Sequence, residues 1–260
     1  MTASYAHDVE AAARQKEALA EHGHRPWPLP DAPWIMGQTW ERLAFLHWRV
    51  PEEALRRVVH PAIPLDTFDG SAWLGVTPFT VTGLHLRHTP PPPLVSSFHE
   101  INVRTYATVD GKPGIYFLSL DAASKVAVHA ARAAYRVPYF HAEIEVERES
   151  DRIHYRHERT QPDGPPAAFE AEYGPTGTTY NAAPGSLDYF LAERYCLYTL
   201  DEDQRVHRGE IHHPPWPLQP ATAAIARNTM AAPYGIELEG DPIAHYAHRQ
   251  DVVFWPLQPL

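Results

Sequence analysis

Hydrophobic and polar residues alternate over many short stretches of this chain, a pattern typical of β-strands with one buried face. The clearest case is a predicted β-hairpin, with strands over 98–109 and 114–120 joined by Asp110-Gly111-Lys112-Pro113. A second hairpin is predicted over 139–149 and 152–161, around Ser150-Asp151. The other predicted strands cover 37–50, 73–79, 81–86, 166–173, 195–200, 205–211, 218–228 and 244–255. So many short strands with few helices predict one closed or nearly closed antiparallel sheet.

Helical stretches are few, and each has recognisable boundaries. Residues 8–22 are strong helix formers followed by Gly23, and their apolar face is mostly alanine, which indicates a surface helix. Pro51 opens a short helix that we expect to end near residue 60. Two more helices are expected over 122–135 and 185–194. We expect residues 1–36 to form the first helix and an extended connector, and 37–260 to form a single domain.

The first hairpin strand carries polar side chains on one of its two faces. Glu100, Asn102, Arg104 and Tyr106 share that face, because successive side chains of a strand point to opposite sides. In a barrel they line a polar cavity if the face is interior, and they are ordinary surface if it is exterior. Alternation alone does not distinguish the two, so both interpretations stay open.

Arg132 is a single charge in an otherwise apolar helical stretch, 127–135. Such a residue is either solvated or buried and paired. Asp121 is the nearest candidate partner, but it can equally cap the start of the helix, which is the simpler interpretation.

Composition excludes several classes of protein. The 260 residues carry a formal net charge of −10, which gives little attraction for nucleic acid or anionic membranes. The 27 prolines suggest many short elements joined by tight loops. The first 22 residues carry charges throughout, and no stretch approaches the length of a membrane span. The single cysteine, Cys196, cannot form an intrachain disulfide and is expected to be a buried, inert thiol. We therefore expect a soluble, cytoplasmic protein.

Metal and cofactor motifs are not apparent in the sequence. The 17 histidines include pairs three residues apart, but these lie in predicted strands or turns, where such positions face opposite sides. A site assembled across the fold, for example with His212 and His213, stays open, although a structural role is the simpler expectation. We expect no metal and no cofactor.

Several segments together resemble a known family. They are Phe45-Leu-His-Trp-Arg-Val50, Leu65-Asp-Thr-Phe-Asp-Gly-Ser-Ala-Trp73, Phe98-His-Glu-Ile-Asn-Val-Arg-Thr-Tyr106, Gly114-Ile-Tyr-Phe-Leu-Ser-Leu-Asp121, Ala131-Arg132, Val137-Pro-Tyr139, Leu191-Ala-Glu-Arg-Tyr-Cys-Leu-Tyr198 and His213-Pro-Pro-Trp-Pro-Leu218. Over about residues 40–255 the chain resembles the bacterial proteins grouped as domain of unknown function 2071, a branch of the acetoacetate-decarboxylase-like superfamily. The resemblance implies a mainly β (α+β) fold, an antiparallel β barrel of cone-like sheets with a few peripheral helices and a pocket inside.

The resemblance also carries one important departure. A glutamate lines the decarboxylase pocket at the position of Glu100, and a Pro-Lys-Lys segment stands at the position of Pro138-Tyr139-Phe140. The first of those lysines forms the Schiff base, which requires a neutral amine that Tyr139 cannot supply. The chain has three lysines, Lys16, Lys112 and Lys125, and Lys125 is the one near an element that could face a pocket. Decarboxylation through an imine is therefore not expected.

Two functional hypotheses follow from different classes. The first is a non-Schiff-base enzyme, lyase- or hydrolase-like, acting on a small carboxylate or carbonyl compound. Glu100 would be its general acid or base, Arg132 or Arg104 would hold an anionic group, and Tyr139 or His141 would donate to a developing oxyanion. Asn102 and Tyr106 would complete the binding surface.

The second hypothesis is a metabolite-binding or sensing protein that keeps the pocket without the chemistry. A third possibility is a structural barrel used for assembly. The partner expected in the first two cases is a small molecule, with no nucleic acid and no membrane, and a homo-oligomer is plausible.

Overall fold

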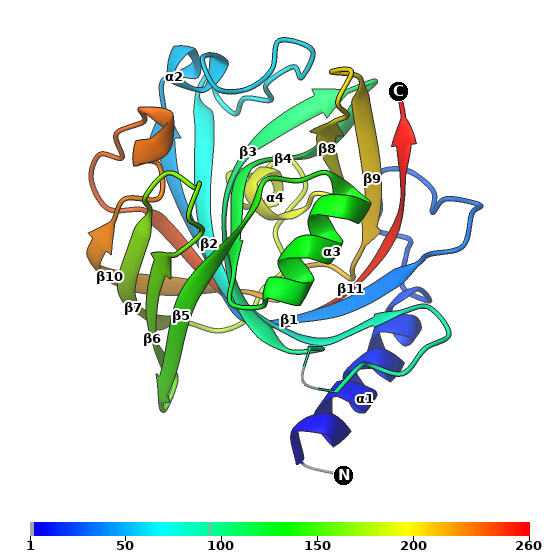
Figure 1. Cartoon of the computed structure of the whole chain (residues 1–260). Coiled ribbons are helices and arrows are strands. Elements are labelled where there is room, and N and C mark those ends of the chain that lie inside the picture. The colour runs from blue at the N-terminus through cyan, green and yellow to red at the C-terminus, as the bar shows by residue number, and fades with distance from the viewer. Residues whose placement is uncertain (1–2, 94) are drawn as a thin grey trace.

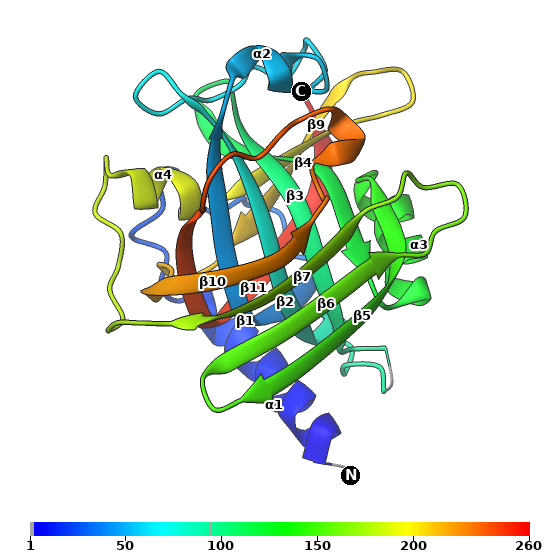
Figure 2. The same cartoon turned by 90° about the vertical axis from the view of Figure 1, so that its left-hand side faces the viewer.

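The computed structural model describes residues 3–93 and 95–260, and its strands form one sheet that closes on itself twice (Figures 1 and 2). The strands are β1 (Met36–Val50), β2 (Ala72–Leu86), β3 (Phe98–Val109), β4 (Lys112–Ala122), β5 (Tyr139–Glu149), β6 (Arg152–Arg159), β7 (Ala168–Pro175), β8 (Cys196–Leu200), β9 (Val206–His212), β10 (Leu218–Asn228) and β11 (Ile243–Pro259). The helices are α1 (Ala3–Ala18), α2 (Glu52–Arg56), α3 (Lys125–Tyr135), α4 (Leu187–Ala192) and a 3₁₀ turn, η1 (Ala232–Tyr234). This is the mainly β barrel architecture that the sequence predicts.

The first closure makes a barrel from β1, β2, β3, β4, β8, β9 and β11. Neighbouring strands pair around the whole ring, and β11 returns to β1. All of these pairings are antiparallel except β4–β8, in which Ile115 pairs with Leu197. We call this ring the barrel. It has no free edge, which removes the hazard of unpaired strand edges.

The second closure makes a flanking sheet from β5, β6, β7 and β10. It leaves the barrel at β4, through parallel pairing with β5, and rejoins it at β11, through β10. Figure 2 shows these four strands lying across the outer side of β1, β2 and β3. Ile101 and Val103 on β3 belong to the same buried apolar cluster as Tyr155 on β6 and Phe169 on β7.

β3 therefore separates two compartments. Its apolar face points to the packed space under the flanking sheet, and its alternate residues point into the barrel. Both faces are buried, because β3 is almost entirely shielded from solvent between Glu100 and Ala107. One face of β3 therefore lies in a close-packed core, and the other face lines a cavity.

Two helices lie at opposite ends of the barrel. In Figure 1 α3 crosses the front opening and α4 is seen behind the strands, and Figure 2 places them on opposite sides of the molecule. Ser124 caps α3, since its side chain accepts a hydrogen bond from Ala127 N at 3.2 Å. α1 packs near the end of β2, where its buried Asp8 accepts hydrogen bonds from Gly83 N and from Ser96 Oγ. Over the described ranges, no helix combines the length and apolarity needed to cross a membrane.

Most predicted elements are present, although several differ in their bounds. The stretches 73–79 and 81–86 form the single long strand β2, whose irregularity comes at Gly83, with φ of 59°. α1 is shifted toward the N-terminus relative to 8–22, and α2 is shorter than expected. Asp121 neither caps α3 nor pairs with Arg132, because its carboxylate is bound by Arg159 and His157.

Candidate functional site

The barrel encloses a cavity of about 310 Å³. Most of its wall is apolar. The apolar side chains come mainly from β1, β2, β4, β8, β9, β11 and α3. The wall residues are Met36, Gln38, Trp40, Leu43, Thr77, Phe79, Leu84, Leu86, Pro92, Val95, Phe98, Glu100, Asn102, Arg104, Ile115, Phe117, Leu120, Val126, Ala127, Ala134, Tyr135, Val137, Tyr139, Leu197, Ile211 and Phe254. A mostly apolar hollow with a few convergent polar groups is the usual form of a small-molecule site.

The polar groups of this wall follow β3. Glu100, Asn102 and Arg104 all line the cavity and are each about nineteen-twentieths buried. Phe98 and Leu86 lie toward the α3 end, so the three residues descend from the mouth to the floor in chain order. Of the two interpretations of this strand, the interior one is correct. Tyr106 continues the same face but lies below the cavity, packed with Trp73 and Leu191.

Glu100 and Tyr139 form a buried pair at the middle of the wall. Tyr139 Oη donates a hydrogen bond of 2.7 Å to Glu100 Oε2. Burial raises the pKa of Glu100 from its ordinary 4.5 to about 8, the Tyr139 hydrogen bond opposes that rise, and the negative charge of Asp121 adds to it. At neutral pH this carboxyl group is therefore mostly protonated, yet it can ionise within one pH unit.

Tyr139 is held by its backbone as well as by its side chain. Arg132 Nε donates to the carbonyl of Tyr139 at 2.7 Å, and Arg132 Nη2 donates to the same oxygen. Arg132 itself is exposed on α3 and does not line the cavity. It therefore contacts the backbone of Tyr139 from outside the cavity. Burial and the neighbouring Glu100 raise the pKa of the Tyr139 hydroxyl well above 10, which keeps it a proton donor.

A second buried network supports the pair from the other side of the sheet. Asp121 accepts two hydrogen bonds from Arg159, at 2.7 and 2.8 Å, and lies 3.0 Å from Nε2 of His157. Tyr155 Oη donates to the backbone carbonyl of Glu100 at 2.8 Å. These contacts fix the strand position of Glu100 while leaving its second carboxyl oxygen toward the cavity.

Arg104 is a buried cation without an acidic partner among the described residues. Its Nη2 donates to the carbonyl of Leu191 at 3.2 Å, and its guanidinium lies 5.0 Å from the centre of the Phe45 ring. Its Nε makes no hydrogen bond to any described residue. A buried charge is costly unless it is paired, so this position favours an anion in the cavity.

Two neighbouring side chains also have unused hydrogen-bonding capacity. Thr77 Oγ1 and Asn102 Oδ1 are buried and find no partner in the described part of the chain. Thr77 pairs directly with Asn102 across β2 and β3, and both line the cavity. These two atoms and Arg104 Nε are enclosed in the wall, so the cavity floor contains polar atoms that no described residue satisfies.

Two of the predicted binding residues lie away from the cavity. Tyr106 Oη donates to the carbonyl of Leu191 at 2.8 Å and lies 2.6 Å from His47 Nε2. It therefore ties β3 to α4 beneath the floor. His141 is half-exposed, with Nδ1 2.9 Å from Thr160 Oγ1. Glu100, Tyr139, Asn102 and Arg104 are brought together, whereas Arg132, Tyr106 and His141 surround them.

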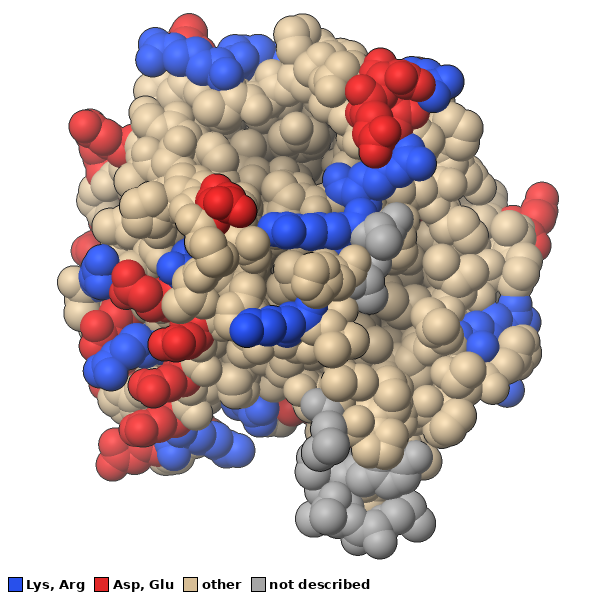
Figure 3. Space-filling view, viewed as in Figure 1, with Lys and Arg blue, Asp and Glu red and all other residues tan. Residues whose placement is uncertain are grey.

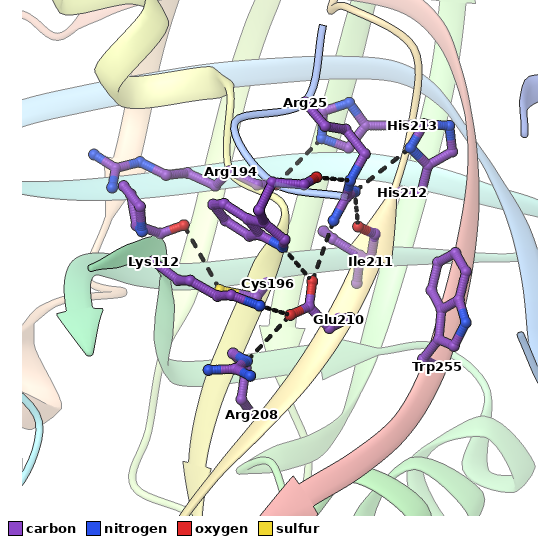
Figure 4. Close-up of polar contacts among 12 residues, drawn as sticks. Arg25, Lys112, Arg194, Cys196, Arg208, Glu210, Ile211, His212, His213 and Trp255 are labelled. Atoms are coloured by element: carbon purple, nitrogen blue, oxygen red, sulfur yellow. Dashed lines mark hydrogen bonds and ion pairs between the residues drawn. The ribbon is translucent and has the colours of Figure 1, made fainter. Parts of the chain in front are cut away.

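The lysines and the cysteine lie elsewhere. Figure 4 shows Lys112 pointing toward Glu210, which also binds Arg25 and Arg208; Lys112 Nζ lies 2.9 Å from Glu210, and neither residue lines the cavity. Lys125 is exposed at the start of α3, and the described residues lining the cavity include no lysine. Cys196 is buried, and burial raises the pKa of its thiol to about 11, so it is protonated at neutral pH.

The adjacent histidines make structural contacts. His212 Nε2 lies 3.0 Å from the carbonyl of Ala18, and His213 Nε2 lies 3.2 Å from the carbonyl of Arg194. They attach the N-terminal segment and the end of α4 to β9. Among the described residues, no group of three or more histidine, cysteine, aspartate or glutamate side chains has the arrangement of a metal site.

Thr77 is the site residue that sequence reasoning missed. Its signal is visible only once β2 and β3 are in register, because it then stands opposite Asn102. The carbonyl of Leu191, which anchors Arg104, comes from a segment 87 residues away and has no local signal at all.

Comparison with known proteins places the chain among conserved families. The model of the DUF2071 family, described as an uncharacterized conserved protein, matches residues 37–251. The uncharacterized protein YqjF of Bacillus subtilis (strain 168) is 46% identical over 231 residues, which cover 88% of this chain and 94% of that protein.

Solved structures with the same fold are more distant in sequence. Acetoacetate decarboxylase superposes with a TM-score of 0.60 at 12% identity, over 94% of this chain and 97% of that one. The enduracididine biosynthesis enzyme MppR, complexed with pyruvate, superposes with a TM-score of 0.60 at 11% identity, over 90% and 93% of the two chains. At this identity the likeness shows the fold, which is acetoacetate-decarboxylase-like.

Proposed function

The chain belongs to the DUF2071 family, and from its barrel cavity we propose an enzyme that transfers a proton to or from a small carboxylate or carbonyl compound through Glu100. The observation that carries this proposal is the buried Glu100–Tyr139 pair, with a 2.7 Å hydrogen bond, in a cavity that also holds the unpaired Arg104. The proposal involves no imine, since the described lining residues include no lysine.

The pKa of Glu100 suits proton transfer near neutral pH. A general acid or base works best when its pKa lies close to the working pH, and burial raises that of Glu100 to about 8. In its ionised form Glu100 removes a proton from a carbon next to the ligand carbonyl. The C–H electrons form a carbon–carbon double bond, and the carbonyl electrons move to oxygen. The neutral Glu100 then returns the proton to the same carbon, so charge and atoms balance and the net result is exchange of that hydrogen.

Tyr139 and Arg104 would stabilise the charges in this reaction. Tyr139 keeps its proton and donates to Glu100, which stabilises the carboxylate whenever Glu100 is ionised. Arg104 would hold the ligand carboxylate, and the side-chain amide nitrogen of Asn102 would donate to the carbonyl or the enol oxygen. Pyruvate is bound by the fold relative MppR, which supports a ligand of this chemical class.

The direct test is hydrogen exchange at carbon. Oxo acids of different lengths are incubated with the protein in D₂O, and loss of the proton signals next to the carbonyl is followed by NMR. The wild-type protein should accelerate exchange, and Glu100→Gln should lower that rate by about 100-fold or more. Glu143→Gln, on an exposed position of β5, is the matched control and should leave the rate unchanged. Equal rates for wild type and Glu100→Gln would refute proton transfer by Glu100.

Borohydride trapping tests the absence of an imine independently. Incubation with the same oxo acids and borohydride should leave every lysine unmodified by mass spectrometry. A reduced adduct on Lys125 would revive Schiff-base chemistry and contradict the proposal.

A silent binding protein is the second candidate, favoured by the tyrosine at position 139, where resemblance places the Schiff-base lysine. Saturable binding of an oxo acid, with no exchange and no product, would identify it.

A further inference from the structure

We infer that the cavity takes a medium-chain carboxylate, with its anionic group on the floor at Arg104 and its apolar chain extending past Glu100 to the mouth beneath α3. This inference rests on the proposed function for the role of Arg104, and it adds the size and orientation of the ligand. Four features of the cavity support it: the depths at which the polar groups lie, the apolar wall, the cavity volume and the residues around the cavity mouth.

The polar groups lie at different depths. Glu100 and Arg104 are four residues apart on β3, which corresponds to roughly 13 Å along an extended strand. An extended chain covers roughly 1.1–1.2 Å per bond, the value for a polypeptide backbone, so a ligand that spans both backbone positions has at most about twelve chain atoms. The side chains of Arg104 and Glu100 shorten the span that the ligand itself must cover.

The volume gives a similar size by a separate route. The cavity holds about 310 Å³, and a water-sized group occupies roughly 30 Å³ in a liquid. The cavity therefore accommodates about ten such groups. Pyruvate has six non-hydrogen atoms and would leave much of an apolar hollow unfilled, which forfeits the favourable burial of apolar surface.

Away from β3 most of the wall around the chain is apolar, although Gln38, Thr77 and Tyr139 also line it. Phe79, Phe117, Leu197 and Ile211 come from four different strands and face the cavity. Such a wall neither hydrogen-bonds nor repels a hydrocarbon chain, and it would bind poly-hydroxylated or multiply charged metabolites badly because their polar groups would lose water without replacement.

The mouth has both an apolar rim and basic surroundings. Leu86 and Val126 line the cavity and are 59% and 60% exposed, unusually high for large apolar side chains. Lys125, Arg132 and Arg136 are exposed on or directly after α3. Figure 3 shows basic side chains on this face, with acidic ones over the β5–β6 hairpin and in a second group at the upper right. Arg136 is paired with Asp201 at 3.8 Å, so Lys125 and Arg132 are the cations that would attract an anion to the apolar rim.

The test measures binding of straight-chain carboxylates, without any reaction, by titration calorimetry. Butanoate, hexanoate, octanoate, decanoate and hexadecanoate are compared at pH 7. Each buried methylene contributes a factor of about three to four, so decanoate should bind at least 100-fold more tightly than butanoate. Beyond decanoate, affinity should stop rising in proportion to chain length. The additional methylenes of hexadecanoate would lie outside the cavity.

Octanol, octylamine and three variants separate the parts of the inference. Octanoate should bind at least tenfold more tightly than octanol and than octylamine. Arg104→Met should lose this preference, whereas Arg227→Met, which removes a surface arginine from β10, should keep it. Leu197→Phe should weaken decanoate at least tenfold and butanoate little, since it fills the apolar part of the cavity.

The outcomes distinguish failure of this inference from failure of the proposed function. Affinity that does not rise with chain length would overturn the medium-chain inference and leave proton transfer by Glu100 in place. Equal affinity for octanoate and octanol would overturn anion binding by Arg104, on which both rest. Chain-length dependence without any effect of Leu197→Phe would place the ligand outside the barrel and would also overturn the inference.

Discussion

The two faces of β3 belong to compartments of opposite character. Toward the flanking sheet, Ile101 and Val103 pack against Tyr155 and Phe169 in a filled apolar core. Toward the barrel, the residues between them surround a cavity of about 310 Å³. The filled side satisfies the ordinary requirement that interiors are close-packed. The hollow side keeps space and unpaired polar atoms that a purely structural barrel would not need.

The difference teaches where stability and function separate in this fold. Asp121, Arg159 and His157 lie on the filled side, where Arg159 and His157 both bind the Asp121 carboxylate, although His157 Nδ1 has no partner in the described chain. Arg104 Nε and Thr77 Oγ1 lie on the hollow side and satisfy nothing in the described chain. Buried polar atoms without partners lower stability, so their retention beside a cavity favours a ligand that completes them.

The largest expected effect on the free energy of unfolding comes from removing a large side chain from the filled core. Phe169→Ala should lower the free energy of unfolding by about 3–5 kcal/mol, because Phe169 is fully buried in the packed core. Phe117→Ala removes the same atoms from a residue that faces the cavity, so its cost should be about half of that or less. Denaturant unfolding measures both. Equal losses would mean that the barrel interior is as tightly packed as the core under the flanking sheet.

The next effect is the pH dependence of stability that Glu100 imposes. Its pKa is raised from 4.5 to about 8 on folding, so the folded state binds this proton more tightly than the unfolded state. The resulting stability is fully present below about pH 4.5 and is lost as pH rises to about 8. Between pH 5.5 and 7.5 the unfolding free energy of the wild type should fall by roughly 2.7 kcal/mol relative to Glu100→Gln, at 1.36 kcal/mol per unit.

Denaturation at several pH values in that window checks this prediction. Glu143→Gln, on the exposed face of β5, should follow the wild-type profile. Parallel profiles for wild type and Glu100→Gln would show that Glu100 ionises alike in the folded and unfolded chains.

The smallest effect distinguishes two threonines on β2. Thr77→Val should raise the free energy of unfolding by about 1 kcal/mol, because it removes an unpaired buried hydroxyl without changing the side-chain shape. Thr80→Val should lower it by about 1 kcal/mol, because Thr80 Oγ1 lies 3.0 Å from His99 Nδ1 in a hydrogen bond. Thermal unfolding of both variants gives the comparison. Destabilisation by Thr77→Val would indicate that this hydroxyl has a partner after all.

Much of the fold could be predicted from the sequence, since the strands are marked by period-two patterns and the turns by their residues. The 98–109 and 139–149 strands have the bounds that their turns indicate. The predicted strands 73–79 and 81–86 form the single strand β2, because pairing with β1 and β3 continues across both stretches. Local patterns do not contain such tertiary support.

The candidate site could be predicted only in part. Alternation placed Glu100, Asn102 and Arg104 on one face, and the resemblance aligned Glu100 and Tyr139 with two pocket positions of the decarboxylases. Their hydrogen bond is found only in the structure. The face that points inward, the partner of Asp121 and the role of Thr77 depend on strand register and on the flanking sheet, which no local stretch encodes. His141 illustrates the limit, since its position next to Phe140 says nothing of its exposure.

The barrel holds Glu100 as a buried carboxyl group that is expected to ionise near neutral pH. The most direct measurement is a titration of side-chain carboxyl carbons by ¹³C NMR, with the Glu100 signal assigned by its absence in Glu100→Gln. We predict an apparent pKa for Glu100 near 8, set by its burial and moderated by Tyr139. A pKa near 4.5 would show that Glu100 is an ordinary ionised carboxylate at neutral pH, and it would contradict the account of the cavity given above.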